Sequence, residues 1–147
     1  MLNTAIVFGR ETPEHEISVR SAKNIIDAID RSKFNLHFMG IDRKGKWRLV
    51  DLEQVGKYVP EQGIELGFVP GTKDPIIRLD NQEPIQNIDL MYLVLHGPNG
   101  EDGTVQGMMR ILDLPFIGPD VLGASAAMDK AVTKALLQEA GVKVAPG

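Results

Sequence analysis

The fold of this chain is organised around the stretch His96-Gly97-Pro98-Asn99-Gly100-Glu101-Asp102-Gly103. An almost continuously apolar run, residues 88–95, precedes the stretch, and a helical pattern begins after it near Thr104. Three glycines and a proline disfavour regular structure, so the stretch is predicted to be a tight loop between a buried strand and a helix. In an open parallel sheet, ligands bind beyond the carboxyl ends of the strands. This loop, which carries a histidine, a glutamate and an aspartate, is therefore the first candidate for a functional site.

A second interpretation of the same loop stays open. Asp102 stands just before the helical pattern, where a carboxylate often accepts hydrogen bonds from the free N–H groups of a helix. The loop would then be a structural strand-to-helix turn, and spacing alone does not separate the two interpretations.

Strands and helices alternate before this loop. Residues 5–9 form an apolar run that ends in a glycine and is typical of a buried strand, and residues 36–41 predict a second strand. Between them, Ala22, Ile25, Ile26 and Ile29 recur at the spacing of one helix face. This βαβ pattern predicts an α/β fold with a Rossmann-like open, mainly parallel sheet and flanking helices.

The segment between the second strand and the loop carries a weaker signal. A turn at residues 42–45 and the apolar residues of 47–50 predict a hairpin strand, and residues 76–79 predict another short strand. Glycines and prolines alternate over residues 56–84, so we expect an irregular excursion there with one or two hairpins.

Helical patterns dominate the chain after the loop. Val105, Met108, Met109 and Leu112 form an apolar stripe, in which the methionines are interpreted as core filling. A very short strand is predicted at residues 116–118 and a helix of small residues at 121–127. Asp129 is expected to cap a last helix with an apolar face, and Gly141 stands where a helix commonly ends.

Composition narrows the class of protein. The chain has 147 residues, 43% of them hydrophobic and 24% charged, which is typical of one globular domain. A net charge of −4 without a basic patch argues against nucleic acid as a partner, and the absence of cysteine excludes disulfides and zinc–thiolate sites. Without a leader pattern or an apolar run of membrane-spanning length, the expected location is the cytoplasm.

Two phosphate-binding motifs do not occur in the sequence. The turn after the first strand offers only Gly9, followed by Arg10, and not the G-x-G-x-x-G of a dinucleotide fold. The chain also has no G-x-x-x-x-G-K-[ST] loop. A phosphate-cradling first loop is therefore not expected.

Three motifs occur in order along the chain, and together they resemble the N-terminal part of the D-alanine–D-alanine ligase family. They are Thr12-Pro13-Glu14-His15-Glu16-Ile17-Ser18, His96-Gly97-Pro98-Asn99-Gly100-Glu101-Asp102-Gly103-Thr104-Val105-Gln106-Gly107, and Met128-Asp129-Lys130. The resemblance covers the whole chain, loosely in residues 43–87. It implies an ATP-grasp enzyme that joins two D-alanines for peptidoglycan, through a D-alanyl phosphate.

The resemblance also implies domains, cofactors and partners. Residues 1–127 would be the N-terminal substrate domain, of the pre-ATP-grasp type, and residues 128–147 the truncated first helix of a central ATP-grasp domain. ATP and Mg²⁺ would be the cofactors, with sites mostly outside this chain, so the chain alone is expected to be inactive. The expected partners are D-alanine, ATP and a second copy in a homodimer, with neither nucleic acid nor a membrane.

The first motif supplies two candidate site residues. Glu14 resembles the carboxylate that holds the ammonium group of the first D-alanine, and Ile17 resembles a residue that lines the same pocket. Without the resemblance, Glu14 would be interpreted as a carboxylate that stabilises the positive end of a helix, worth roughly 0.3–1 kcal/mol.

The second and third motifs supply the other candidates. His96, Gly97 and Glu101 resemble loop residues beside the first substrate, and Lys130 resembles a lysine that reaches the ATP phosphates. The resemblance implies no metal ligand within the chain. It has one departure, because the family usually has a second glycine where Arg10 stands.

Other functions are weighed against this one. A ligase that joins D-alanine to D-lactate or to D-serine would share the same N-terminal motifs. A flavodoxin-like or receiver-like binding module is a different class. A receiver needs an acidic pair after the first strand and an aspartate after the third, whereas this chain offers Glu11 alone and His96.

Overall fold

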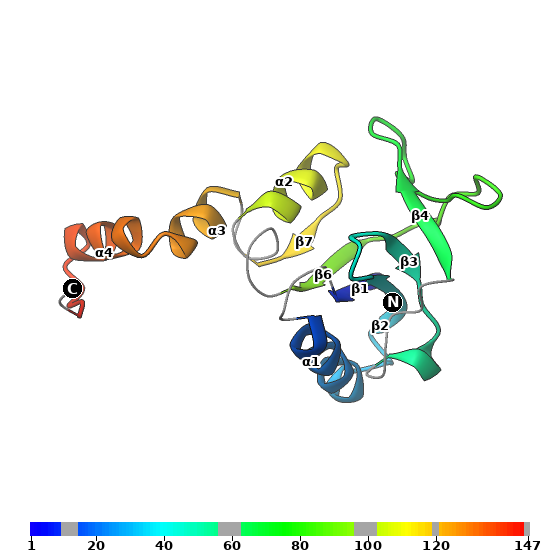
Figure 1. Cartoon of the computed structure of the whole chain (residues 1–147), viewed down its shortest axis with the longest axis horizontal. Coiled ribbons are helices and arrows are strands. Elements are labelled where there is room, and N and C mark those ends of the chain that lie inside the picture. Colours follow the sequence, from blue (N-terminus) through cyan, green and yellow to red (C-terminus); the bar gives the residue numbers. More distant parts are fainter. Residues whose placement is uncertain (10–14, 56–62, 96–102, 119–120, 146–147) are drawn as a thin grey trace.

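The computed structural model describes residues 1–9, 15–55, 63–95, 103–118 and 121–145 (Figure 1). In these residues, helices flank a seven-stranded mixed sheet that curls into a half-barrel, with the strand order β5-β4-β3-β2-β1-β6-β7. The elements in chain order are β1 (Leu2–Gly9), α1 (His15–Ala28), β2 (Phe34–Ile41), β3 (Trp47–Leu49), the 3-10 helix η1 (Leu52–Gln54), β4 (Ile64–Phe68), β5 (Ile76–Arg78), β6 (Leu90–Val94), α2 (Thr104–Ile111), β7 (Phe116–Ile117), α3 (Val121–Met128) and α4 (Lys130–Glu139).

Four neighbouring strands, β2, β1, β6 and β7, run parallel to one another. The predicted βαβ unit is confirmed, because α1 connects β1 to its parallel neighbour β2. The strands predicted near residues 88–95 and 116–118 are confirmed as β6 and β7. In this register Phe8 of β1 lies opposite Val94 of β6.

The expectation of a mainly parallel sheet is wrong. The strands β3, β4 and β5 extend the sheet from β2 by three successive antiparallel pairings. Connections of the hairpin type produce antiparallel neighbours. The hairpin strand predicted at residues 47–50 is confirmed as β3, and the short strand predicted at residues 76–79 is confirmed as β5, whereas β4 was not predicted. The alternation of Ile64, Leu66 and Phe68 with Glu65 and Gly67 is the signal that could have revealed β4.

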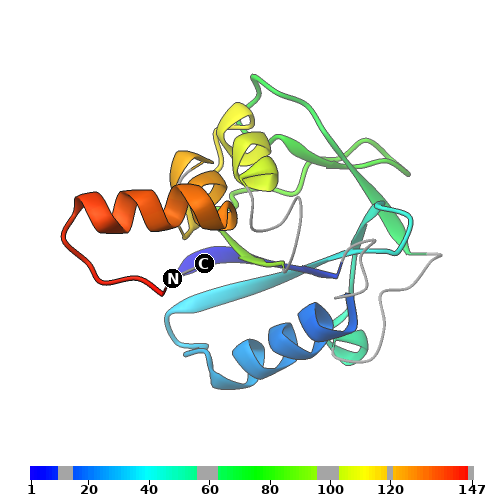
Figure 2. The same cartoon turned by 60° about the vertical axis from the view of Figure 1, so that its left-hand side comes forward.

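Both faces of the parallel strands are covered, which explains the continuous apolar sequence of β1. Ala5 and Val7 lie in the core on one face, with Met109 of α2, whereas Ile6 and Phe8 lie in the core on the other face, with residues of α1. Figure 2 shows α1 and α2 on opposite sides of the sheet. Met109 is fully buried and Met108 packs against the same core, so the interpretation of the methionines as core residues is confirmed.

The last helix, α4, has the predicted ends but no buried face among the described residues. Asp129 caps it by accepting a 3.0 Å hydrogen bond from the N–H of Val132. Its end is a Schellman turn, in which the N–H groups of Gly141 and Val142 bond to the carbonyls of Gln138 and Leu137 at 3.0 and 2.8 Å. No residue of α4 is buried, and the helix packs on α3 and projects from the sheet (Figure 1).

Among the described residues, no helix has the length and apolar character needed to cross a bilayer.

Candidate functional site

The carboxyl ends of β1 and β6 lie side by side at one edge of the sheet. These strands are parallel neighbours, and Phe8 is in register with Val94. The chain leaves β1 into residues 10–14 and leaves β6 into residues 96–102. These two stretches, called the motif segments below, therefore start from the same edge. This is the edge at which ligands bind in open α/β sheets.

Two helices begin at this edge. α1 starts at His15 and α2 starts at Thr104, each directly after one of the two motif segments. The positive ends of both helices therefore lie at the edge where residues 10–14 and 96–102 leave the sheet. Such an environment favours carboxylates, either from the protein or from a ligand.

The N-cap position of α2 belongs to the glycine that follows Asp102. The N-cap is Gly103, with a φ of 97°, and glycine has no side chain that could cap the helix from this position. A positive φ is readily adopted by glycine, which explains the residue type at this sharp turn. Asp102 lies outside the described residues, so its expected role as a capping carboxylate stays a prediction.

Ser18 joins the start of α1 to the ends of both strands. Its Oγ accepts a 2.8 Å hydrogen bond from the N–H of Gly9 and donates a hydrogen bond to the carbonyl of Val94. The side chain is fully buried. No motif in the sequence singles out Ser18, although its spacing of four from Ala22 places it on the buried face of α1.

Most of the candidate residues lie outside the described part of the chain. Glu14, His96, Gly97 and Glu101 belong to this group, and their proximity to one another stays a prediction. Ile17 is described: it lies in the first turn of α1 and is 55% exposed. It therefore lies close to the edge from which the two motif segments start.

Lys130 lies in a different part of the molecule. It is the first residue of α4 and is exposed. α4 packs on α3 and projects away from α1, β1 and β6 (Figure 1). The structure does not bring Lys130 to the edge that carries Ile17.

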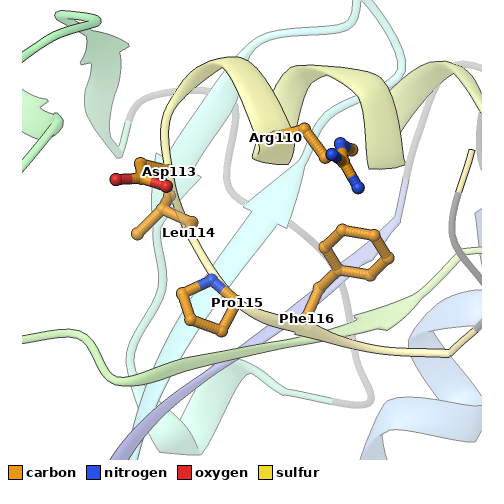
Figure 3. A pocket seen from close by; sticks show the side chains of 5 residues that line it. All are labelled: Arg110, Asp113, Leu114, Pro115 and Phe116. Carbon is orange, nitrogen blue, oxygen red and sulfur yellow. The ribbon is translucent and has the colours of Figure 1, made fainter.

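A cavity of about 380 Å³ lies at the opposite edge of the sheet (Figure 3). It is lined by Arg110, Asp113, Leu114, Pro115 and Phe116, from the end of α2 to the start of β7. Because β7 runs parallel to β6, its start lies at the amino edge, away from the motif segments. This cavity is therefore separate from the candidate site.

The described residues do not offer a metal site. No three histidine, aspartate or glutamate side chains of this part of the chain come close enough together to hold an ion.

The fold and the edge geometry define an α/β domain with a candidate ligand site at the carboxyl ends of β1 and β6. A family model, described as "D-ala D-ala ligase N-terminus", matches residues 3–119. The chain belongs to this family.

Relatives agree with the family over almost the whole chain. This chain is 42% identical over 154 aligned residues to D-alanine–D-alanine ligase A of Salmonella typhimurium, and it has the same identity to that of Escherichia coli K12. These alignments cover 99% of this chain and 42% of the relatives, so the chain spans less than half of their length.

Solved structures share the fold. The D-alanine–D-alanine ligase of Coxiella burnetii matches with a TM-score of 0.87 at 30% identity, over 99% of this chain and 44% of that one. The VanG D-Ala:D-Ser ligase of Enterococcus faecalis matches with a TM-score of 0.86 at 28% identity, over 99% of this chain and 43% of that one.

Proposed function

We propose that this chain is the N-terminal substrate domain of an ATP-dependent ligase that joins two D-alanines into D-alanyl-D-alanine for peptidoglycan. The family match over residues 3–119 carries the proposal. The common edge from which the two motif segments start supports it, because two walls of one cleft can form there.

The proposed substrate site uses the two motif segments. Glu14 binds the ammonium group of the first D-alanine, Ile17 lines its pocket, and His96, Gly97 and Glu101 lie beside it. The first D-alanine reacts at its carboxylate, so its amino group must stay out of the reaction. A carboxylate that keeps this amine protonated orients the substrate and suppresses its nucleophilicity.

Most of the proposed ATP-binding site lies in a part of the enzyme that this chain does not contain. We propose that residues 1–127 are a Rossmann-like, pre-ATP-grasp domain, and that residues 128–147 open the central ATP-grasp domain, with Lys130 at the ATP phosphates. The exposed apolar side chains of α4, such as Val132 and Leu136, support this division, since further protein can cover them. When bound, ATP would transfer its terminal phosphoryl group to the carboxylate of the first D-alanine and leave as ADP, and Mg²⁺ would neutralise charge on the phosphates.

The proposal includes a cytoplasmic homodimer. The side chains of Ile111 in α2 and Leu122 in α3 are 70% and 81% exposed, and apolar groups of this kind favour association. Light scattering of the intact protein tests this part, and a strictly monomeric enzyme would contradict it.

A ligase for D-serine is the second candidate, because VanG matches with almost the same TM-score as the D-alanine enzyme of Coxiella burnetii. The test is to incubate the intact protein with ATP, Mg²⁺ and D-alanine, with D-serine or D-lactate as competitors. We expect ADP to form together with D-alanyl-D-alanine, measured by mass spectrometry, and L-alanine to be inactive. An intact protein that forms no ADP in response to D-alanine would overturn the proposal.

A further inference from the structure

One buried hydroxyl group connects three elements at the edge of the candidate site. Ser18 of α1 accepts a hydrogen bond from Gly9, the last residue of β1, at 2.8 Å, and donates one to Val94, the last residue of β6. Gly9 has a φ of 99°, so the chain turns sharply where this bond forms. The hydroxyl therefore lies where both motif segments leave the sheet.

These hydrogen bonds satisfy two buried backbone groups, the N–H of Gly9 and the carbonyl of Val94. A buried backbone group without a hydrogen-bond partner costs free energy. A hydroxyl is well suited to the position because it is a donor and an acceptor at one atom. Alanine and valine offer neither function, whereas threonine keeps both.

The positions of these residues in the sequence connect the hydroxyl to both walls of the site. Ser18 follows Glu14 by four positions, and Val94 precedes His96 by two. A movement of α1 relative to the end of β6 would change the separation of the segments that carry Glu14 and His96. The bond from Ser18 to Val94 resists that movement directly.

We infer that Ser18 is a positioning residue for the first D-alanine, which fixes the two walls of its site relative to each other. This role rests on the proposed function, because it assumes that D-alanine binds between the two segments. A displacement of about 1 Å at a reacting group can change a rate by about a hundredfold, so loss of the hydroxyl should have a large effect on this substrate.

The test compares four variants of the intact enzyme. We expect Ser18→Ala to raise the KM for the first D-alanine by about tenfold or more, and the KM for ATP to stay within about twofold. Ser18→Thr and Ser18→Val form a matched pair, because their side chains have nearly the same shape and differ in the hydroxyl. The KM of Ser18→Thr for the first D-alanine should stay close to that of the wild type. Ser18→Val should raise this KM as Ser18→Ala does.

Val19→Ala is the control for general destabilisation. Val19 is buried on the same helix, in the core with Ile6 and Phe8, so its truncation lowers stability without touching the hydroxyl. We expect Val19→Ala to lower Tm and leave the KM for the first D-alanine within about twofold. An equal rise of the KM in Val19→Ala, or equal KM values in the threonine and valine variants, would overturn the positioning role.

Amide hydrogen exchange gives a second readout that does not depend on activity. The N–H of Gly9 should exchange faster in Ser18→Ala and Ser18→Val than in Ser18→Thr. Unchanged exchange in all variants would contradict the role. A wild-type enzyme that does not ligate D-alanine would overturn the proposed function and this role with it. An active wild type with an unaffected Ser18→Ala variant would overturn this role alone.

Discussion

Nε of Arg48 lies 2.9 Å from Oδ2 of Asp42, and the two side chains are only 7% and 3% exposed. Arg48 also donates a 2.8 Å hydrogen bond from Nη1 to the carbonyl of Gly63. Oδ1 of Asp42 accepts hydrogen bonds from the N–H groups of Lys44 and Lys46 at 2.9 and 3.0 Å. This buried pair joins the turn after β2 to β3 and to the chain entering β4.

Breaking this pair should destabilise the chain strongly. We expect Asp42→Asn to cost about 3–5 kcal/mol in the free energy of unfolding, because it leaves the guanidinium of Arg48 buried without its buried charge partner. Urea unfolding of the 147-residue chain measures this. Glu65→Gln is the matched control, because Glu65 lies 3.7 Å from the same guanidinium but is 37% exposed, and should cost at most about 1 kcal/mol. A loss in Asp42→Asn no larger than in the control would contradict the role of the buried pair.

The carboxylate of Asp42 should also make the folded chain less stable in acid. Burial alone would raise the pKa of Asp42, but the hydrogen bonds from Arg48 and from two backbone N–H groups lower it below its ordinary value of 3.8. The stability that this lowered pKa supplies is present above pH 3.8 and is lost as the pH falls through the folded pKa. The free energy of unfolding should therefore fall less between pH 4 and pH 2 in Asp42→Asn than in the wild type.

His37 should make the free energy of unfolding depend on pH closer to neutrality. Its side chain lies on β2, where His37 is in register with Ala5, and its buried Nε2 has no hydrogen-bond partner among the described residues. Burial lowers the pKa of His37 below its ordinary value of 6.5. Because the unfolded chain then binds a proton more readily, stability should decrease as the pH falls below 6.5.

Replacing His37 tests this dependence. We expect His37→Gln to flatten the decrease in the free energy of unfolding just below pH 6.5, since glutamine does not titrate. Nuclear magnetic resonance should show the imidazole of His37 titrating below 6.5 in the wild type. Titration of this imidazole at or above 6.5 would contradict the prediction.

Glu14 is the residue on which the proposed substrate role depends most directly. A charge-assisted hydrogen bond contributes roughly 1.5–3 kcal/mol, which corresponds to about a ten- to hundredfold change in affinity. We therefore expect Glu14→Gln in the intact enzyme to raise the KM for the first D-alanine by that factor, with little change for ATP. Steady-state kinetics with each substrate varied in turn measures both constants.

A matched control separates this role from helix stabilisation. Glu16→Gln removes the same charge two positions further along the chain, in the first turn of α1. If Glu14 only stabilised the helix, both variants would show a small loss of thermal stability and normal kinetics. An unchanged KM for the first D-alanine in Glu14→Gln would return Glu14 to that structural role.

The 147-residue chain alone should neither bind Mg-ATP with micromolar affinity nor ligate D-alanine. Phosphoryl transfer depends on positioned metal ions and cationic groups, and the described residues offer no metal site. Isothermal titration calorimetry of the chain with Mg-ATP measures the affinity. Tight binding would contradict the assignment of the nucleotide site to the remainder of the enzyme.

Local patterns determined a large part of this structure. The apolar run of β1, the stripe that includes Val105 and Met109, and the cap at Asp129 were all predicted from residue spacing and confirmed. Each of these features depends on residues within one or two turns of helix or one strand. The family was also recognisable from the sequence, because its motifs are contiguous stretches whose order along the chain is preserved.

Only the tertiary structure decided how distant segments pair. The hairpin strand β3 was predicted, but the extension of the sheet through β4 and β5 depends on pairings that the weak signal of this segment did not reveal. Ser18 and Val94 are 76 positions apart, and Arg48 reaches a carbonyl 15 positions away. A serine in a helix and an arginine in a short strand are ordinary surface residues by composition. The helix periodicity places Ser18 on the buried face of α1, but the hydrogen-bond partners of both residues follow from the packing of α1 on the sheet and from the curl of the strands, which no local pattern encodes.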